Sequence, residues 1–185
     1  RIDTIGFNPD GTIIKVIPTL RGVGNSDART QIQIDRYSEI APTASIAYLN
    51  EDNKFDGWKT LFKKSGAWVR YNRVEFGQEP VKQVKFRVLA PKGAKLEVSI
   101  AGGKSIATVN VPRSNNWEIV SAPVKKSPTG LQDLKITLKS GQAEVDWMIF
   151  DAKPWTAGGM QTGKYRNLLA ELGYKQADID AKLND

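Results

Sequence analysis

The chain has 185 residues, of which 40% are hydrophobic and 25% charged, so it predicts one globular domain with a short appendage and excludes disordered, collagen-like and disulfide-stapled chains. It contains no histidine and no cysteine, which excludes Ser-His-Asp and Cys-His catalysis and thiolate metal sites, while carboxylate chemistry stays possible. The net charge of +7 comes mainly from residues 32–151, where it is scattered over alternate strand positions such as Lys85 and Arg87. That pattern argues against a nucleic-acid-binding face, which would show clustered basic residues with interleaved aromatics.

The first 31 residues have too few apolar side chains to form a core of their own. They hold a turn, Asn8-Pro9-Asp10-Gly11, an apolar run over 12–17 and a Gly-rich polar loop over 21–27. We interpret residues 1–31 as the end of an upstream domain and a linker. The chain starts at Arg1 rather than Met and shows neither a leader nor an apolar membrane span, so we expect a piece of a longer protein and no membrane contact.

Short runs of alternating apolar and polar residues fill the segment 32–151. Ile32, Ile34 and Tyr37 open the series, and further runs cover 69–76, 84–88, 96–100, 107–111, 120–124, 134–138 and 145–149. Turn clusters such as Pro91-Lys92-Gly93 separate the runs, and no amphipathic helix intervenes. This pattern predicts an all-β fold, an antiparallel β-sandwich of the jelly-roll type. Within the last run, Trp147 shares parity with Val145 and Ile149, which predicts a core position.

The period changes to a helical one in residues 152–185. Residues 153–159 are typical of a linker, and Trp155 within them is expected to pack against a neighbouring domain. Tyr165, Leu168 and Leu172 recur at helical spacing, Gly173 can end that helix, and a second short helix follows around Ile179. We expect a short helical appendage that begins a downstream domain.

Five motifs within 32–151 together resemble the family 6 carbohydrate-binding modules. They are Ile32-Gln33-Ile34-Asp35-Arg36-Tyr37-Ser38, Gly66-Ala67-Trp68-Val69-Arg70-Tyr71 running on to Val74-Glu75-Phe76-Gly77, Val111-Pro112 with Trp117, Gly130-Leu131-Gln132-Asp133-Leu134, and Val145-Asp146-Trp147-Met148-Ile149-Phe150. Each motif is weak alone, but their order and spacing are specific. The resemblance implies a jelly-roll module that binds a glycan and has no catalytic residues.

The flanking segments resemble parts of glycoside hydrolases. The stretch 7–24 is similar to the tail of a family 43 enzyme, and 164–169 with Asp178-Ile179-Asp180 is similar to the start of a family 8 enzyme. The resemblance implies a multimodular, xylan-degrading bacterial enzyme that is secreted or periplasmic. The adjacent hydrolase domains of that polypeptide would then be partners of this module, and their catalytic carboxylates would lie outside this chain.

Aromatic side chains are the candidates for sugar contact, because a pyranose ring stacks its apolar face on a flat ring. The resemblance places Trp117, after the polar turn 114–116, at the family's stacking position, where loop packing is the alternative. The second wall of that cleft would be Phe62 or Trp58, and core packing is an equal alternative for each. Trp68 matches a second site on a sheet face in some members, and its parity with Arg70 suggests that it points outward.

One position departs from the family pattern. Where the family has an Asn two residues before its closing Asp-Trp pair, this chain has Glu144. An ionised carboxylate only accepts hydrogen bonds, whereas an amide also donates them. The main cleft is therefore expected to be altered in specificity or silent.

The family resemblance also implies a structural Ca²⁺ ion. Gln33, Asp35 and Asp146 fall on the positions of its oxygen ligands, and such ligands suit a hard cation. The site requires the first and last strands of the sandwich to be neighbours. The alternative is three polar residues on edge strands.

These observations support a non-catalytic module that binds β-xylan or xylo-oligosaccharides by aromatic stacking. A structural spacer that orients two hydrolase domains and has lost sugar binding is the main rival, which Glu144 favours. An enzyme is the third possibility, because paired carboxylates can hydrolyse glycosides, but no such pair is singled out by its context.

Overall fold

The structure, a computed structural model, describes residues 5–15, 24–100 and 103–151. These belong to a unit that spans Arg1–Ala152. The predicted helices, the linker with Trp155 and the end of the 12–17 run lie outside the described residues.

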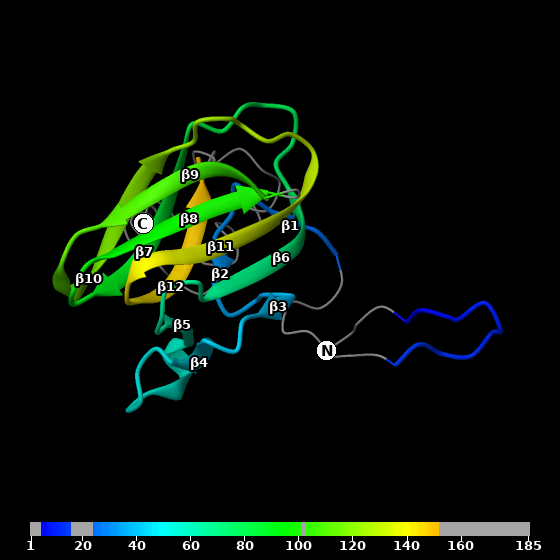
Figure 1. The fold of residues 1–185 in the computed structure, drawn as a ribbon, viewed down its shortest axis with the longest axis horizontal. Helices are drawn as coiled ribbons and strands as arrows, with labels where there is room; N and C mark the ends of the chain where they lie inside the picture. Colours follow the sequence, from blue (N-terminus) through cyan, green and yellow to red (C-terminus); the bar gives the residue numbers. More distant parts are fainter. Residues whose placement is uncertain (1–4, 16–23, 101–102, 152–185) are drawn as a thin grey trace, which may run out of the picture. The chain divides into compact units, whose positions relative to one another are not determined.

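Two six-stranded sheets form the module (Figure 1). Sheet one has the order β1 (Ser26–Asp27), β6 (Trp68–Glu75), β11 (Leu131–Gly141), β8 (Ala94–Ile100) and β9 (Lys104–Val111), with β3 (Glu39–Ile40) also pairing with β6. Sheet two has the order β10 (Ser114–Pro123), β7 (Gln83–Ala90), β12 (Ala143–Phe150), β5 (Trp58–Phe62) and β4 (Ala44–Tyr48), with β2 (Ile32–Gln33) also pairing with β12. Every pairing is antiparallel except β1 with β6, and one short 3₁₀ helix, η1 (Lys54–Asp56), precedes β5.

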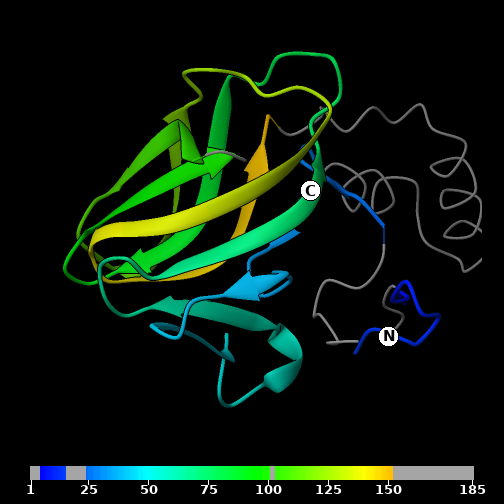
Figure 2. The same ribbon diagram turned by 45° about the vertical axis from the view of Figure 1, so that its right-hand side comes forward.

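The core lies between the inner faces of the two sheets, which Figure 2 shows as two layers. Alternate residues of each strand are fully buried there, among them Val69 and Tyr71 of β6 and Phe86 of β7. The Tyr71 hydroxyl donates a 2.5 Å hydrogen bond to the carbonyl of Ile34, so this buried polar group is satisfied. The all-β sandwich predicted from the alternating pattern is confirmed.

Strands β4 and β5 were absent from the sequence-based prediction. In Trp58-Lys59-Thr60-Leu61-Phe62 both faces mix apolar and polar residues, and in Ala44-Ser45-Ile46-Ala47-Tyr48 only Ser45 interrupts the apolar residues, so neither strand alternates clearly. They pair with each other in full register, Ala44 with Phe62 through Tyr48 with Trp58. Cross-strand pairing, rather than alternation, therefore defines this hairpin.

The predicted core position of Trp147 is wrong. An irregularity in β12 between Val145 and Trp147 shifts the register against β7. Trp147 then pairs with Arg87 and is half-buried on the outer face, whereas Met148 and Phe150 are fully buried. The extra residue at the bulge inverts the parity that the alternation implied.

The Asn8–Gly11 turn closes a small hairpin. The amide of Asn8 donates to the Thr12 carbonyl at 2.8 Å, and Phe7 and Ile13 form an isolated antiparallel bridge. Gly11 has a φ of 82°, a conformation that favours glycine. The apolar run that begins at residue 12 contributes this bridge and no longer strand within the described residues.

Candidate functional site

The outer face of sheet one carries a polar cavity of about 480 Å³ around Trp68. Its walls come from β3, β6, β8 and β11 and the turn that precedes β9. The lining residues are Glu39, Trp68, Arg70, Ser99, Ile100, Gly103, Asp133, Leu134 and Lys135. Because Trp68 starts β6 with its parity opposite to buried Val69, its ring faces outward, as the sequence suggested.

Arg70 is the centre of a hydrogen-bonded network in this cavity. Its guanidinium contacts Asp133 at 2.7 Å and Glu39 at 3.3 Å. These two carboxylates raise the pKa of Arg70 above its ordinary value, and the hydrogen bond that the guanidinium donates to Asp133 contributes most. The two ion pairs orient the Arg70 guanidinium beside Trp68 and place donors and acceptors where ligand hydroxyl groups could meet them.

The Lys135 ammonium lies 4.6 Å from the centre of the Trp68 ring. Lys135 pairs with Arg70 across the β6–β11 ladder, next to Thr137, the cross-strand partner of Trp68. A cation–π contact at an exposed site is worth only about 0.5–1 kcal/mol. A ligand ring can therefore displace the ammonium at small cost, and the ammonium can then donate to ligand hydroxyls.

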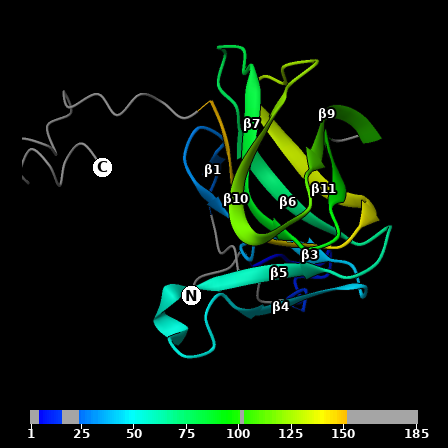
Figure 3. The ribbon, with the colours of Figure 1, turned by 90° about the vertical axis from the view of Figure 1, so that its left-hand side faces the viewer.

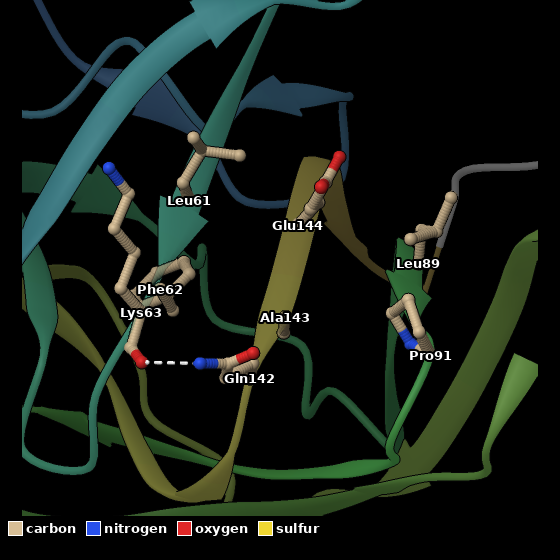
Figure 4. A pocket seen from close by; sticks show the side chains of 8 residues that line it. All are labelled: Leu61, Phe62, Lys63, Leu89, Pro91, Gln142, Ala143 and Glu144. Carbon is tan, nitrogen blue, oxygen red and sulfur yellow. Dashed lines mark hydrogen bonds between the residues drawn. The ribbon is translucent and has the colours of Figure 1, made fainter. Parts of the chain in front are cut away.

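A smaller cavity of about 200 Å³ surrounds Glu144 on the outer face of sheet two (Figure 4). Glu144 lies between Leu61 of β5 and Leu89 of β7, its cross-strand partners. Its carboxylate pairs with Lys59 at 2.8 Å. The flanking walls are two leucines, and the aromatic residue of the lining, Phe62, is buried, so this cavity lacks a stacking platform.

Phe62 and Trp58, the two residues expected at the second wall of this cleft, lie differently from each other. Phe62 is among the residues that line the Glu144 cavity (Figure 4), but it is only 1% exposed and packs in the core, so it lacks the open ring face that stacking needs. Trp58 is 42% exposed. It lies on the same face of β5 as Thr60, whose cross-strand partner Val145 is in the core, whereas Glu144 is paired with Leu61 on the other face. For Phe62 the burial agrees with the core-packing alternative, and for Trp58 sugar contact stays a prediction.

Trp117 lies half-buried in β10, where the pairing with β7 is irregular between Ser114 and Glu118. The guanidinium of Arg87 lies 4.9 Å from the centre of its ring. Trp117 does not line the Glu144 cavity. The structure thus separates Trp117 from Phe62 and Trp58, the two aromatics that the sequence grouped with it.

The three residues expected to bind Ca²⁺ lie on neighbouring segments. β2 pairs with β12, Gln33 opposite Trp147, and the amide of Ile34 donates to the Asp146 carbonyl at 2.8 Å. Asp35 and Asp146 are 8% and 6% exposed. Burial, and then the negative charge of Asp35, raise the pKa of Tyr71 well above its ordinary value.

This donor set fits a hard cation in chemistry, since it offers two buried carboxylates and an amide oxygen. The described residues contain no cluster of three or more acidic or histidine ligands, so Gln33 and backbone carbonyls would have to complete the shell. Asp146 also forms an ion pair with Arg87, which any cation would have to share.

A family model for carbohydrate-binding modules of family 6 matches residues 43–152. The chain belongs to this family. Modules of family 6 bind carbohydrate and have no catalytic activity of their own. No curated protein matches the chain.

Solved structures of family 6 modules share the fold. A Clostridium stercorarium module in complex with cellobiose is 23% identical, with a TM-score of 0.62 over 70% of this chain and 98% of its own. A β-1,3-glucan-binding module from Bacillus halodurans is 21% identical, with a TM-score of 0.61 over 70% and 100%. A family 43 arabinoxylan arabinofuranohydrolase from Bacillus subtilis matches over 82% of this chain but only 33% of its own, at 20% identity and a TM-score of 0.63.

Among the described residues, no helix has the length and apolar character needed to cross a membrane.

Sequence reasoning missed three charged groups that line the cavity with Trp68, namely Glu39, Asp133 and Lys135. Part of this could have been read from the sequence. Lys135 and Thr137 alternate with the apolar Ile136 and Leu138, which are buried, so the side chains of Lys135 and Thr137 are expected on the outer face of the sheet. The pairing of β11 with β6, which brings them to Trp68, could not be read from the chain.

Proposed function

We propose that this module binds β-xylan and xylo-oligosaccharides at the outer face of sheet one, with a sugar ring stacked on Trp68. The observation that carries the proposal is the 480 Å³ cavity in which an outward-facing indole is surrounded by the Arg70 network and Lys135. A pyranose with equatorial hydroxyls offers a flat apolar face and a polar edge, which match the ring and the charged groups respectively. Family members solved with cellobiose and with xylose support a ligand of this shape.

Trp117 and Glu144 are proposed as two lesser contacts on sheet two. The indole of Trp117 is half-buried with Arg87 against it, and Lys59 already engages Glu144. A sugar in the Glu144 cavity would have to compete with that ion pair, and Leu61 and Leu89 offer it no aromatic ring. We therefore assign the greater share of the affinity to Trp68.

Affinity gel electrophoresis in soluble xylan tests the assignment. Retardation is expected for the unchanged chain, a loss of about tenfold or more in affinity for Trp68→Ala, and about twofold for Trp117→Ala. The absence of retardation for the unchanged chain would refute glycan binding. An equal loss for Trp117→Ala would move the main site to sheet two.

The parent protein is proposed to be a multimodular xylan-degrading hydrolase that is exported from a bacterial cell. The similarity of the flanks to hydrolases of families 43 and 8 supports this, as does the family 43 arabinoxylan enzyme among the solved structures. Tethering would hold the catalytic domains near insoluble substrate by raising their effective concentration. Deleting residues 32–151 from the parent should lower its activity on insoluble xylan and leave activity on xylohexaose unchanged.

A structural Ca²⁺ ion held by Gln33, Asp35 and Asp146 is also proposed. The adjacency of β2 and β12 supports it, and the ion would neutralise buried carboxylates. Addition of EDTA should lower the melting temperature, and an unchanged value in EDTA and in added Ca²⁺ would refute the site.

The second candidate function is a rigid spacer between hydrolase domains. The buried ring of Phe62 and the Lys59–Glu144 pair favour it, because both deprive the predicted main cleft of sugar-binding groups. A spacer would show no glycan binding by either sheet, so the electrophoresis separates the two functions.

A further inference from the structure

The outer end of the β4–β5 hairpin carries an aromatic pair that lines neither the Trp68 cavity nor the Glu144 cavity. Tyr48 and Trp58 are cross-strand partners at the end of the hairpin next to η1. Exposure along β5 rises from 1% at Phe62 and 0% at Thr60 to 42% at Trp58. The hairpin therefore runs out beyond the core, as Figure 3 shows for β4 and β5 at one end of the sandwich.

The pair forms an ordered stack. The ring centres of Tyr48 and Trp58 are 4.2 Å apart and the rings are tilted by 30°. The Lys54 ammonium lies 5.1 Å from the centre of the Tyr48 ring. Tyr48 is thus in contact with both a lysine and an indole, and one side of the exposed Trp58 ring packs against an aromatic neighbour.

The turn that carries the stack is braced by its own hydrogen bonds. The Asn50 side-chain amide donates to Asp56 at 2.8 Å, and the Asn53 amide donates to the other oxygen of the same carboxylate. The Asn53 side chain also accepts from the Phe55 amide at the start of η1. A braced turn loses little conformational entropy when a ligand binds.

The chemistry of this surface suits a neutral glycan. The turn that precedes Trp58 carries amide and carboxylate groups, and the same turn exposes the apolar side chain of Phe55, which is 97% exposed. A stable protein interface would need roughly 800 Å² of contact with an apolar centre, whereas a single indole among hydrogen-bonding groups matches one pyranose ring. Three acids and one base lie between residues 51 and 56, so uronate-bearing chains would be repelled.

We propose that the Tyr48–Trp58 stack is a separate contact for a neutral β-linked polysaccharide, distinct from the Trp68 and Glu144 cavities. The stack lies on a protruding hairpin. It would therefore contact one part of a polymer chain or particle surface while another part of the polymer is bound at Trp68. The proposal extends the function proposed above, because the polymer is of the same class, but it depends on different residues.

Depletion binding of the 185-residue chain to insoluble arabinoxylan, a neutral polymer, tests this contact. Trp58→Ala should weaken the partition constant about threefold to tenfold, in the unchanged chain and in the Trp68→Ala background. Trp58→Tyr keeps an aromatic ring and should retain most of the binding. That result would show that the weaker binding of Trp58→Ala is not caused by a loss of folding. Ile119→Ala removes a 64% exposed apolar side chain from the opposite edge strand of the same sheet and should have no effect.

Calorimetry with xylohexaose separates the two proposals. Unchanged partition of Trp58→Ala, an equal loss for Ile119→Ala, or a parallel loss of xylohexaose affinity in Trp58→Ala would each overturn the separate contact while the Trp68 site stands. Binding that depends on Trp58 but not on Trp68 or Trp117 would overturn the proposed main site and leave this one. Absence of all binding would refute both.

Discussion

Removal of the guanidinium of Arg87 should destabilise the module substantially. Its partner Asp146 is only 6% exposed, so Arg87→Met leaves a carboxylate in the sheet without its cation. Breaking a buried pair costs about 3–5 kcal/mol, and the partial exposure of Arg87, whose side chain is 31% accessible, favours the lower end. Loss of the contact with the Trp117 ring adds about 0.5 kcal/mol. We expect a total of about 3 kcal/mol, or a fall in Tm of roughly 8–10 °C.

Urea denaturation at neutral pH followed by tryptophan fluorescence measures this loss. Asp146→Asn in the Arg87→Met background removes the unpaired charge and should recover at least half of the lost free energy. If Ca²⁺ binds at Asp146, millimolar Ca²⁺ should stabilise Arg87→Met more than the unchanged chain. A loss below about 0.5 kcal/mol for Arg87→Met would refute the reasoning, since it would mean that Asp146 is solvated or already neutralised.

Gly141→Ala should cost more than 2 kcal/mol of folding free energy or prevent folding, because a Cβ there would lie 2.1 Å from the Gly93 carbonyl oxygen, at a φ of 79°. Gly66→Ala is the control: its φ is 85° but no atom lies within 4 Å of the added Cβ, so it should cost only about 1 kcal/mol. Equal urea midpoints for the two variants would contradict this. Stability should fall as pH rises through about 10, since burial raises the pKa of Tyr71 and the folded state keeps a proton that the unfolded chain releases. In Tyr71→Phe the part of this fall due to Tyr71 should disappear from melting curves at pH 9–11, and an unaltered pH dependence would contradict the assignment. Glu144→Gln should change the free energy of unfolding by less than about 0.5 kcal/mol, because its pair with Lys59 is partly exposed, and a larger change in urea denaturation would count against this.

The sandwich could be predicted because its longer strands alternate strictly. In β7 every second residue is buried, and in the middle of β11 Leu134, Ile136 and Leu138 are buried, a pattern that can be read directly from the sequence. The β4–β5 hairpin could not be found in this way. Its residues become buried through pairing with β12, which lies about 80 residues away in the chain.

The core position of Trp147 was misjudged because parity depends on local register. A bulge of one residue sends Trp147 outward and Met148 inward. For Phe62, counted back from Trp68 by motif spacing, the sequence left sugar contact and core packing open, and its side chain is 1% exposed in the core beside the Glu144 cavity. Motif spacing locates a residue along the chain, but the face it occupies follows from hydrogen-bond pairing.

The sequence predicted one residue of the candidate site, Trp68, but not the residues that surround it. Trp68 was identified as outward-facing from its neighbours in the strand. Glu39 and Lys135 reach it only because β3 and β11 flank β6. Contacts between strands that are distant in sequence leave no local pattern, so the network around the indole becomes visible only in the folded chain.

A crystal structure of the chain soaked with xylohexaose tests glycan binding at sheet one most directly. We predict one xylose ring stacked on Trp68, with the Lys135 ammonium displaced from its place 4.6 Å from the ring centre and Arg70 still paired with Asp133. Sugar bound in the Glu144 cavity, with Trp68 still covered by Lys135, would contradict the account.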